Sequence, residues 1–221
     1  MSDRERWARE HWESGLTYDA WKRSMTRNLD RVEANDRRVK IEDHTRRAFE
    51  QVERRLRVVA VGADWCGDVI ANLPVLARLA KETGELDVRV FERDGAASPI
   101  DFYLNQGAFK SIPVFAFFDA DWKEVGVFIE RPESVTETRA RKRHEIFAAH
   151  PEFGSPDAPP DQLPEDVRAR LQQEVQKMRD GMADWADGEV IREIGAIALG
   201  QAKRGGARQP DQGERNTAAG T

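Results

Sequence analysis

The sequence predicts an α/β fold in which helices flank a small mixed sheet. Segment 56–62 is a short apolar run rich in β-branched residues, which is typical of a central strand covered on both faces. Segment 86–93 alternates apolar and polar residues, as a strand does. Two further apolar runs, 114–118 and 124–129, are separated by a short turn and predict a hairpin. One crossover followed by one hairpin gives a mixed sheet of about four to five strands.

Helices are predicted in the intervals around these strands. Apolar residues recur at helical spacing over 64–80, and Pro74 inside this segment predicts a kink. Segment 98–106 begins with an N-cap serine followed by proline, which predicts a short helix. A last helix of the domain is predicted over 132–150, between two prolines.

The composition divides the chain into five segments. Apolar stripes in otherwise charged regions predict helical extensions at both ends of the α/β domain. A cluster of prolines predicts a linker, and the polar end of the chain is expected to be disordered. The segments are an N-terminal helical extension at 1–54, the α/β domain at 55–150, a Pro-rich linker at 151–164, C-terminal helices at 165–203 and a disordered tail at 204–221.

Both extensions carry apolar faces. Trp21, Met25, Leu29 and Val32 follow one another at intervals of three and four residues, which predicts one face of one helix. We expect these faces and those of the C-terminal helices to pack on the α/β domain. A surface for a partner or a second copy is the alternative, and the sequence leaves the oligomeric state open.

Composition and charge limit the function classes. The net charge is −5 and basic residues are interleaved with acidic ones, so we expect no nucleic-acid partner. The first residues lack an apolar signal region and no run is long enough to span a bilayer, so we expect a cytoplasmic protein without a membrane partner. The four histidines lack metal-ligand spacing and there is one cysteine, so we expect no metal site and no cofactor.

The residues that carry chemistry stand where the first strand meets the kinked helix. Trp65, Cys66, Gly67 and Asp68 follow one another there. A thiol at a helix N-terminus faces unpaired backbone N–H groups and the positive end of the helix dipole, which favour the thiolate. Cys66 is therefore a candidate nucleophile.

This region resembles the thioredoxin superfamily, and most of all the bacterial thioredoxin-like branch with a Trp-Cys-x-Asp motif. The resemblance covers about residues 55–145 and includes the kinking proline of the helix and a loop proline before the third strand. It implies a thioredoxin-like fold, a cis peptide bond at Ile112–Pro113 and an extended substrate lying beside Cys66. The residues that carry it are Trp65, Cys66, Pro74, Ser111, Ile112, Pro113, Val114 and Gly126.

The chain departs from the family at two positions. Val69 stands where the resolving cysteine would be, three residues after Cys66, so a mixed disulfide on Cys66 has no internal thiol to resolve it. Ala60 stands where the family has a buried acid. Asp68 cannot be assumed to replace that acid, because a carboxylate in the first helical turn favours the helix but repels a neighbouring thiolate, and the sequence leaves the direction of the Cys66 pKa shift open.

Three hypotheses follow for the function. The first is monothiol thiol–disulfide exchange or redox sensing at Cys66, with a protein or a low-molecular-weight thiol or disulfide as partner and glutathione or another external thiol as resolving agent. If the protein is an enzyme, this is the expected activity. The second is a binding module for peptides or proteins that has lost redox chemistry. The third, a glutathione-ligated iron–sulfur carrier, is motivated only by the single cysteine, and Trp-Cys-Gly-Asp is not the motif of such proteins.

Overall fold

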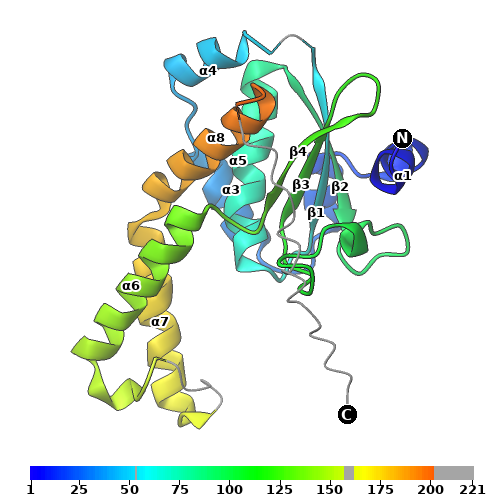
Figure 1. Cartoon of the computed structure of the whole chain (residues 1–221). Coiled ribbons are helices and arrows are strands. Elements are labelled where there is room, and N and C mark those ends of the chain that lie inside the picture. The colour runs from blue at the N-terminus through cyan, green and yellow to red at the C-terminus, as the bar shows by residue number, and fades with distance from the viewer. Residues whose placement is uncertain (53, 157–161, 202–221) are drawn as a thin grey trace, which may run out of the picture.

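A four-stranded mixed sheet forms the centre of the protein (Figure 1). The computed structural model describes residues 1–52, 54–156 and 162–201. The strand order is β2-β1-β3-β4, in which β1 pairs with β2 in parallel and β3 pairs antiparallel with both β1 and β4. The predicted mixed sheet is thus confirmed, and its strands are β1 (Leu56–Gly62), β2 (Leu86–Glu92), β3 (Val114–Phe118) and β4 (Glu124–Ile129).

The two central strands are buried along almost their whole length. Every residue of β3 is buried, and all of β1 is buried except Arg57. Phe115 of β3 stacks on Phe128 of β4 with ring centroids 5.1 Å apart. Apolar β-branched and aromatic side chains on both faces are what a covered central strand requires.

Helix α5 (Gly67–Thr83), which contains Pro74, packs directly on the sheet. It contacts α3 (Leu29–Arg38) and α8 (Ala183–Ala198) along its outer side. Helix α8 also contacts β4, and a Cβ atom built on Gly126 would lie only 2.7 Å from Ile197. Glycine at 126 therefore lets the C-terminal helix approach the sheet.

The N-terminal region lies on both sides of this core. Helix α1 (Asp3–His11) is on the opposite side of the sheet from α5 in Figure 1, and the 3₁₀ helix η1 (Trp12–Ser14) follows it. Leu16 pairs with Val90 at the outer edge of β2. Helix α4 (Asp43–Phe49) contacts α5 and α8.

The prediction of one helix through Trp21 and Val32 is wrong. Helix α2 (Tyr18–Ser24) ends before Met25, and α3 begins at Leu29. Between them the backbone N–H groups of Thr26 and Arg27 donate to the carboxylate of Asp64. These bonds hold the chain in a turn, so the helical spacing of the apolar residues spans two helices.

The short helix predicted over 98–106 is mostly absent. Only a 3₁₀ helix, η2 (Ile100–Phe102), forms there. Asn105 donates to the side chains of Ser111 and Glu130, and the residue after it, Gln106, has a φ of 53°. The left-handed backbone at Gln106 cannot continue a right-handed helix, so the segment ends in a turn.

Helices α6 (Glu133–Ala149) and α7 (Glu165–Gly181) pack side by side and extend away from the sheet (Figure 1). The 3₁₀ helix η3 (Pro151–Phe153) lies between them in the chain, and Phe153 is only 1% exposed against Phe147 and Leu171. The beginning of the predicted linker is thus packed and ordered. Residues 157–161 of that linker and the predicted tail at 204–221 lie outside the described residues.

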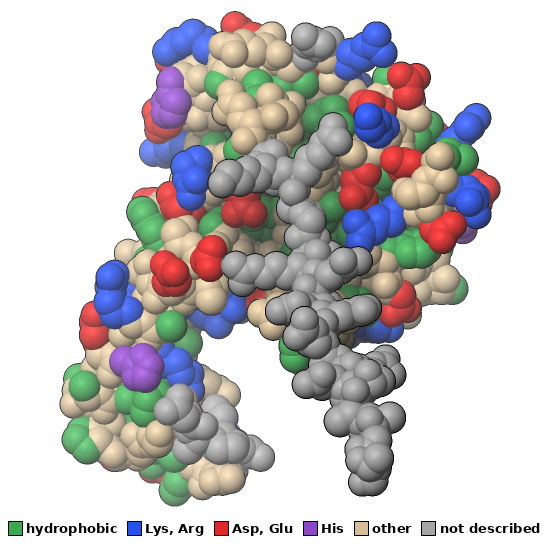
Figure 2. All heavy atoms as spheres, viewed as in Figure 1, with side chains coloured by type: hydrophobic (Ala, Val, Ile, Leu, Met, Phe, Trp, Pro, Cys, Tyr) green, Lys and Arg blue, Asp and Glu red, His purple; other side chains and the backbone are tan. Residues whose placement is uncertain are grey.

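Charges of both signs are interspersed over the face in Figure 2. Within the described ranges, no helix has the length and apolar character needed to cross a membrane.

Candidate functional site

Cys66 lies between the end of β1 and the first turn of α5, at the N-cap position. Its side chain is half-buried, and the thiol Sγ is 3.5 Å from the carbonyl oxygen of Ile112, to which it donates. The peptide bond between Ile112 and Pro113 is cis. Three residues named from the sequence, Cys66, Ile112 and Pro113, therefore meet although 46 positions separate the thiol from the loop.

Val69 is placed to support the first turn of α5 from within the core. Its side chain is fully buried, and a Cβ built on Gly62 would lie 2.9 Å from Cγ1 of Val69. Glycine at the end of β1 therefore lets the helix pack closely on the strand. Ala60 is also fully buried, so the interior near the thiol carries no acid at that position.

Opposing effects act on the pKa of the Cys66 thiol, and the net shift is upward. Burial is the largest cause, because the charged thiolate loses water. The backbone N–H groups of Val69 and Asp68 lower the pKa, as the helix N-terminus predicts. The carboxylates of Asp68 and Glu130 raise it again by like-charge repulsion.

Asp68 is held by two arginines that the local sequence did not indicate. It is only 9% exposed, and its carboxylate accepts hydrogen bonds from Arg131 and from Nη1 of Arg139, the second at 2.5 Å. Arg131 lies in the loop between β4 and α6, and Arg139 lies on α6. Their separation of more than sixty residues from Asp68 leaves no local pattern by which sequence reasoning could find them.

Trp65 lies on the surface directly before the thiol. The indole is 49% exposed, and the guanidinium of Arg93 is 5.4 Å from its ring centroid. Asp64, one residue earlier, accepts from the backbone of Thr26 at 2.7 Å and of Arg27 at 3.0 Å. These bonds fix the strand-to-helix turn while leaving an aromatic surface beside Cys66.

Glu130 connects the proline loop to α5. Its backbone N–H donates to the carbonyl of Pro113 at 2.7 Å, and its own carbonyl accepts from Nδ2 of Asn72 at 2.8 Å. The residue has a φ of 64°, in the left-handed region. Sequence reasoning missed this link, because neither Asn72 nor Glu130 stands in a recognisable motif.

Gly67 faces different surroundings from Cys66. A Cβ built on it would be 3.1 Å from Nη1 of Arg179, on α7.

Among the described residues, no group of three or more His, Cys, Asp or Glu side chains is arranged to hold a metal ion. The Cys66 site offers one half-buried thiol beside the carbonyl of Ile112.

Comparison with known proteins identifies the family. A family model described as Thioredoxin matches residues 15–143, which is more than half of the chain, and the chain belongs to this family. No curated protein matches the sequence.

Two solved structures share the fold. One is a crystal structure of a protein of unknown function from Pseudomonas aeruginosa, with a TM-score of 0.58 and 18% sequence identity, covering 88% of this chain and 98% of that one. The other is a crystal structure of an HIV epitope scaffold, with a TM-score of 0.56, 18% identity and the same coverage.

Proposed function

We propose that this thioredoxin-like protein acts through Cys66 alone, by forming a mixed disulfide with a protein or a low-molecular-weight disulfide. The observation that carries the proposal is the half-buried thiol at the start of α5, 3.5 Å from the Ile112 carbonyl. An extended chain containing a disulfide can lie against this loop with one sulfur near Cys66. Trp65 offers an exposed apolar surface next to it.

The exchange requires no cofactor beyond an external thiol. The Cys66 thiolate attacks one sulfur of the disulfide, a new S–S bond forms, and the other sulfur leaves as a thiolate that takes up a proton. A second thiol, such as glutathione, then attacks the mixed disulfide and releases Cys66. Because Cys66 is the single cysteine of the chain and valine stands at position 69, this second step has to use an external thiol.

The raised pKa of Cys66 is one factor that limits the rate of this chemistry. The thiolate is a minority species at neutral pH, so the attack is slow compared with that of a low-pKa thiol. Slow formation of the mixed disulfide and its resolution by an external thiol fit a sensor or a stoichiometric thiol carrier better than a rapid dithiol catalyst. We expect the protein to work in the cytoplasm, where free thiols persist and glutathione is present.

The same raised pKa supports a second candidate, a peptide- or protein-binding module without redox function. In that case the proline loop and Trp65 hold a partner, and Cys66 is a small residue within the contact surface. The exposed indole beside a half-buried thiol is the observation that favours it.

Incubation of the folded protein with oxidised glutathione, followed by intact-protein mass spectrometry, separates the two candidates. The monothiol proposal predicts a single glutathione adduct that persists until a reducing thiol is added. Cys66→Ser is the control and should give no adduct. If the folded wild-type protein stays unmodified while the unfolded protein is modified, the binding module is favoured.

A further inference from the structure

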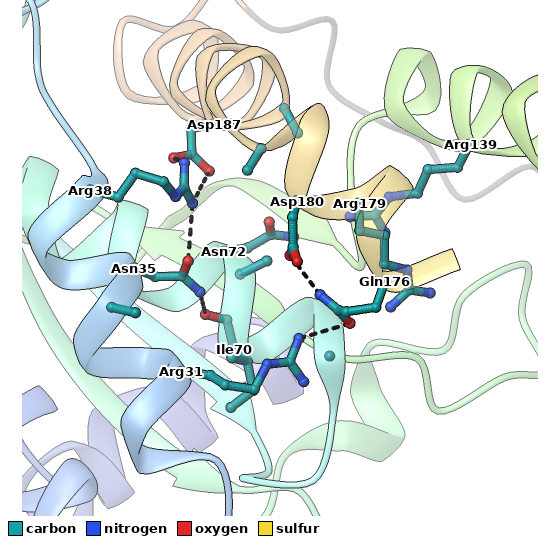
Figure 3. Close-up of a pocket in the computed structure, with 15 residues that line it drawn as sticks. Arg31, Asn35, Arg38, Ile70, Asn72, Arg139, Gln176, Arg179, Asp180 and Asp187 are labelled. Atoms are coloured by element: carbon teal, nitrogen blue, oxygen red, sulfur yellow. Dashed lines mark hydrogen bonds and ion pairs between the residues drawn. The ribbon is translucent and has the colours of Figure 1, made fainter. Parts of the chain in front are cut away.

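A cleft borders the first turn of α5 on the side of α3, α6, α7 and α8 (Figure 3). Its volume is about 540 Å³, within the range of roughly 300–1,000 Å³ that small-molecule sites occupy. The cleft is lined by Gly67, and its other walls carry arginines from three helices: Arg31 and Arg38 of α3, Arg139 of α6 and Arg179 of α7.

Arg179 reaches the cleft without a counter-ion. Its Nε atom is buried and has no hydrogen-bond partner, and its Nη1 atom lies against Gly67. Within the described part of the chain, its guanidinium forms neither an ion pair nor a hydrogen bond. A half-buried guanidinium in this state loses water without compensation, which is unfavourable unless an anion binds.

Arg31 approaches the same space from the opposite wall. Figure 3 shows its guanidinium reaching from α3 toward Gln176 of α7, whose Oε1 accepts from Nη2 at 3.2 Å. No carboxylate pairs with Arg31 among the residues that the structure describes. Two arginines from facing helices thus lack an acidic partner.

The acids in the walls of the cleft differ in their partners. Asp187 is bound by Arg38 at 2.5 Å, whereas the exposed Asp180 accepts from the uncharged Nε2 of Gln176 at 2.7 Å and pairs with no cation among the described residues. Asp68, which follows Gly67 in the chain, is shared between Arg131 and Arg139. Burial and the positive charge of Arg139 lower the pKa of Arg179, and the negative charge of Asp68 offsets them only in part.

We propose that this cleft binds a phosphate group, held by Arg31 and Arg179 from its two walls. Guanidinium groups match phosphate oxygens in charge and geometry, and donors from two directions suit a tetrahedral anion better than a planar carboxylate. The volume exceeds that of one phosphate ion, which leaves room for the rest of a small phosphate ester. Gly67 and not Cys66 lines the cleft, so the proposal does not depend on the chemistry of the thiol.

Isothermal titration calorimetry on the full chain tests the proposal, with inorganic phosphate, glycerol phosphate and succinate as probes and sodium chloride at matched ionic strength as reference. Saturable binding of phosphate or glycerol phosphate is expected, with succinate weaker by about tenfold or more. The tighter of the two phosphate probes identifies the free ion or an ester as the source.

Two variants and one matched control locate the binding. Arg179→Gln and Arg31→Gln should each weaken phosphate binding by about tenfold or more, because each removes charge-assisted bonds. Arg170→Gln removes a charge from an exposed position of the same helix α7 and should leave binding unchanged. Circular dichroism establishes that each variant is folded.

Three results would overturn the proposal. They are an absence of saturable binding beyond that of chloride, wild-type affinity in folded Arg179→Gln and Arg31→Gln, and succinate binding as tight as that of phosphate.

Discussion

The first turn of α5 separates two surroundings that differ in polarity. On one side the Cys66 thiol is half-buried beside the Ile112 carbonyl, and its pKa is raised. On the other side Gly67 faces the guanidinium of Arg179 in a cleft lined by arginines. Cys66 and Gly67 are adjacent in the chain. The positive charge of the cleft nevertheless does not bring the pKa of the Cys66 thiol below its ordinary value.

Burial is the main cause of the raised pKa of Cys66, and the carboxylate of Asp68 adds to it. The Asp68 carboxylate pairs with Arg131 and Arg139, so it compensates the positive charge of both. The same negative charge raises the pKa of Cys66. Positive charge near a thiol therefore lowers its pKa less when the thiol is buried and a carboxylate stands nearby, and removing the carboxylate of Asp68 tests its share of this effect.

The largest effect is expected from Asp68→Asn. The change leaves Arg131 and Arg139 without their carboxylate in a mostly buried site, and we expect a loss of about 3 kcal/mol in the free energy of unfolding. Urea unfolding followed by circular dichroism measures it. Asp94→Asn, which removes an acid that is 67% exposed beside Arg93, should change stability by less than about 1 kcal/mol. Equal losses in the two variants would contradict the structural role of Asp68.

A smaller loss is expected from Asp64→Ala. The variant removes three hydrogen bonds to Thr26 and Arg27 that hold the turn between α2 and α3, and should lower the free energy of unfolding by about 2 kcal/mol. Thr26→Ala removes only the hydroxyl bond and should have a smaller effect. A greater loss in Thr26→Ala than in Asp64→Ala would show that the carboxylate does not hold this turn.

The contribution of Asp64 should also depend on pH. Burial alone would raise the pKa of its carboxyl, but hydrogen bonds from Thr26 and Arg27 outweigh burial and lower it. A lowered folded-state pKa gives stability that is present above the unfolded-state value of about 3.9 and is lost as the pH falls through the folded value. The difference between wild type and Asp64→Ala should therefore shrink only in acid, and a difference that shrinks near neutral pH would contradict this origin.

The reactivity of Cys66 should increase when the charge of Asp68 is removed. In Asp68→Asn the thiol loses a repelling carboxylate, so its pKa falls and alkylation by iodoacetamide at neutral pH should become faster by roughly severalfold. Asp94→Asn again serves as the control. An unchanged alkylation rate in folded Asp68→Asn would show that the carboxylate of Asp68 does not raise the pKa of the Cys66 thiol.

The smallest effect is expected at Glu193 on α8, which lines neither the Cys66 site nor the cleft beside Gly67. Burial raises the pKa of its carboxyl, so ionisation disfavours the folded state as the pH rises from the unfolded-state value through the folded one. Glu193→Gln should increase the free energy of unfolding at neutral pH by less than about 1 kcal/mol, with the gain vanishing in acid. The exposed Glu137 of α6 provides the control substitution, Glu137→Gln. A loss of stability in Glu193→Gln would show that its charge is favourable.

The strands and the position of Cys66 could be predicted because their signals are local. The run 56–62 and the hairpin at 114–129 carry their own periodicity, and the single Cys66 follows directly at a helix start. The break between α2 and α3 could not be predicted, because it depends on bonds from Thr26 to Asp64 across 38 positions.

The cleft could not be predicted from the sequence either, because it too depends on contacts between residues that are distant in the chain. Arg31, Arg139 and Arg179 are spread over most of the chain and meet only when three helices pack around α5. Each of them stands in a charged helix where an arginine is unremarkable on the sequence alone. Only the packing shows which arginines lack a carboxylate.

The rate of Cys66 alkylation by iodoacetamide as a function of pH tests the central claim, that this thioredoxin-family protein presents one accessible but weakly ionised thiol. The account predicts labelling of the folded protein with a midpoint above about 8.5, the ordinary pKa of cysteine, and no labelling of Cys66→Ser. A midpoint near neutral pH would contradict the role given to burial and Asp68. An absence of labelling until the protein unfolds would contradict the accessible thiol itself.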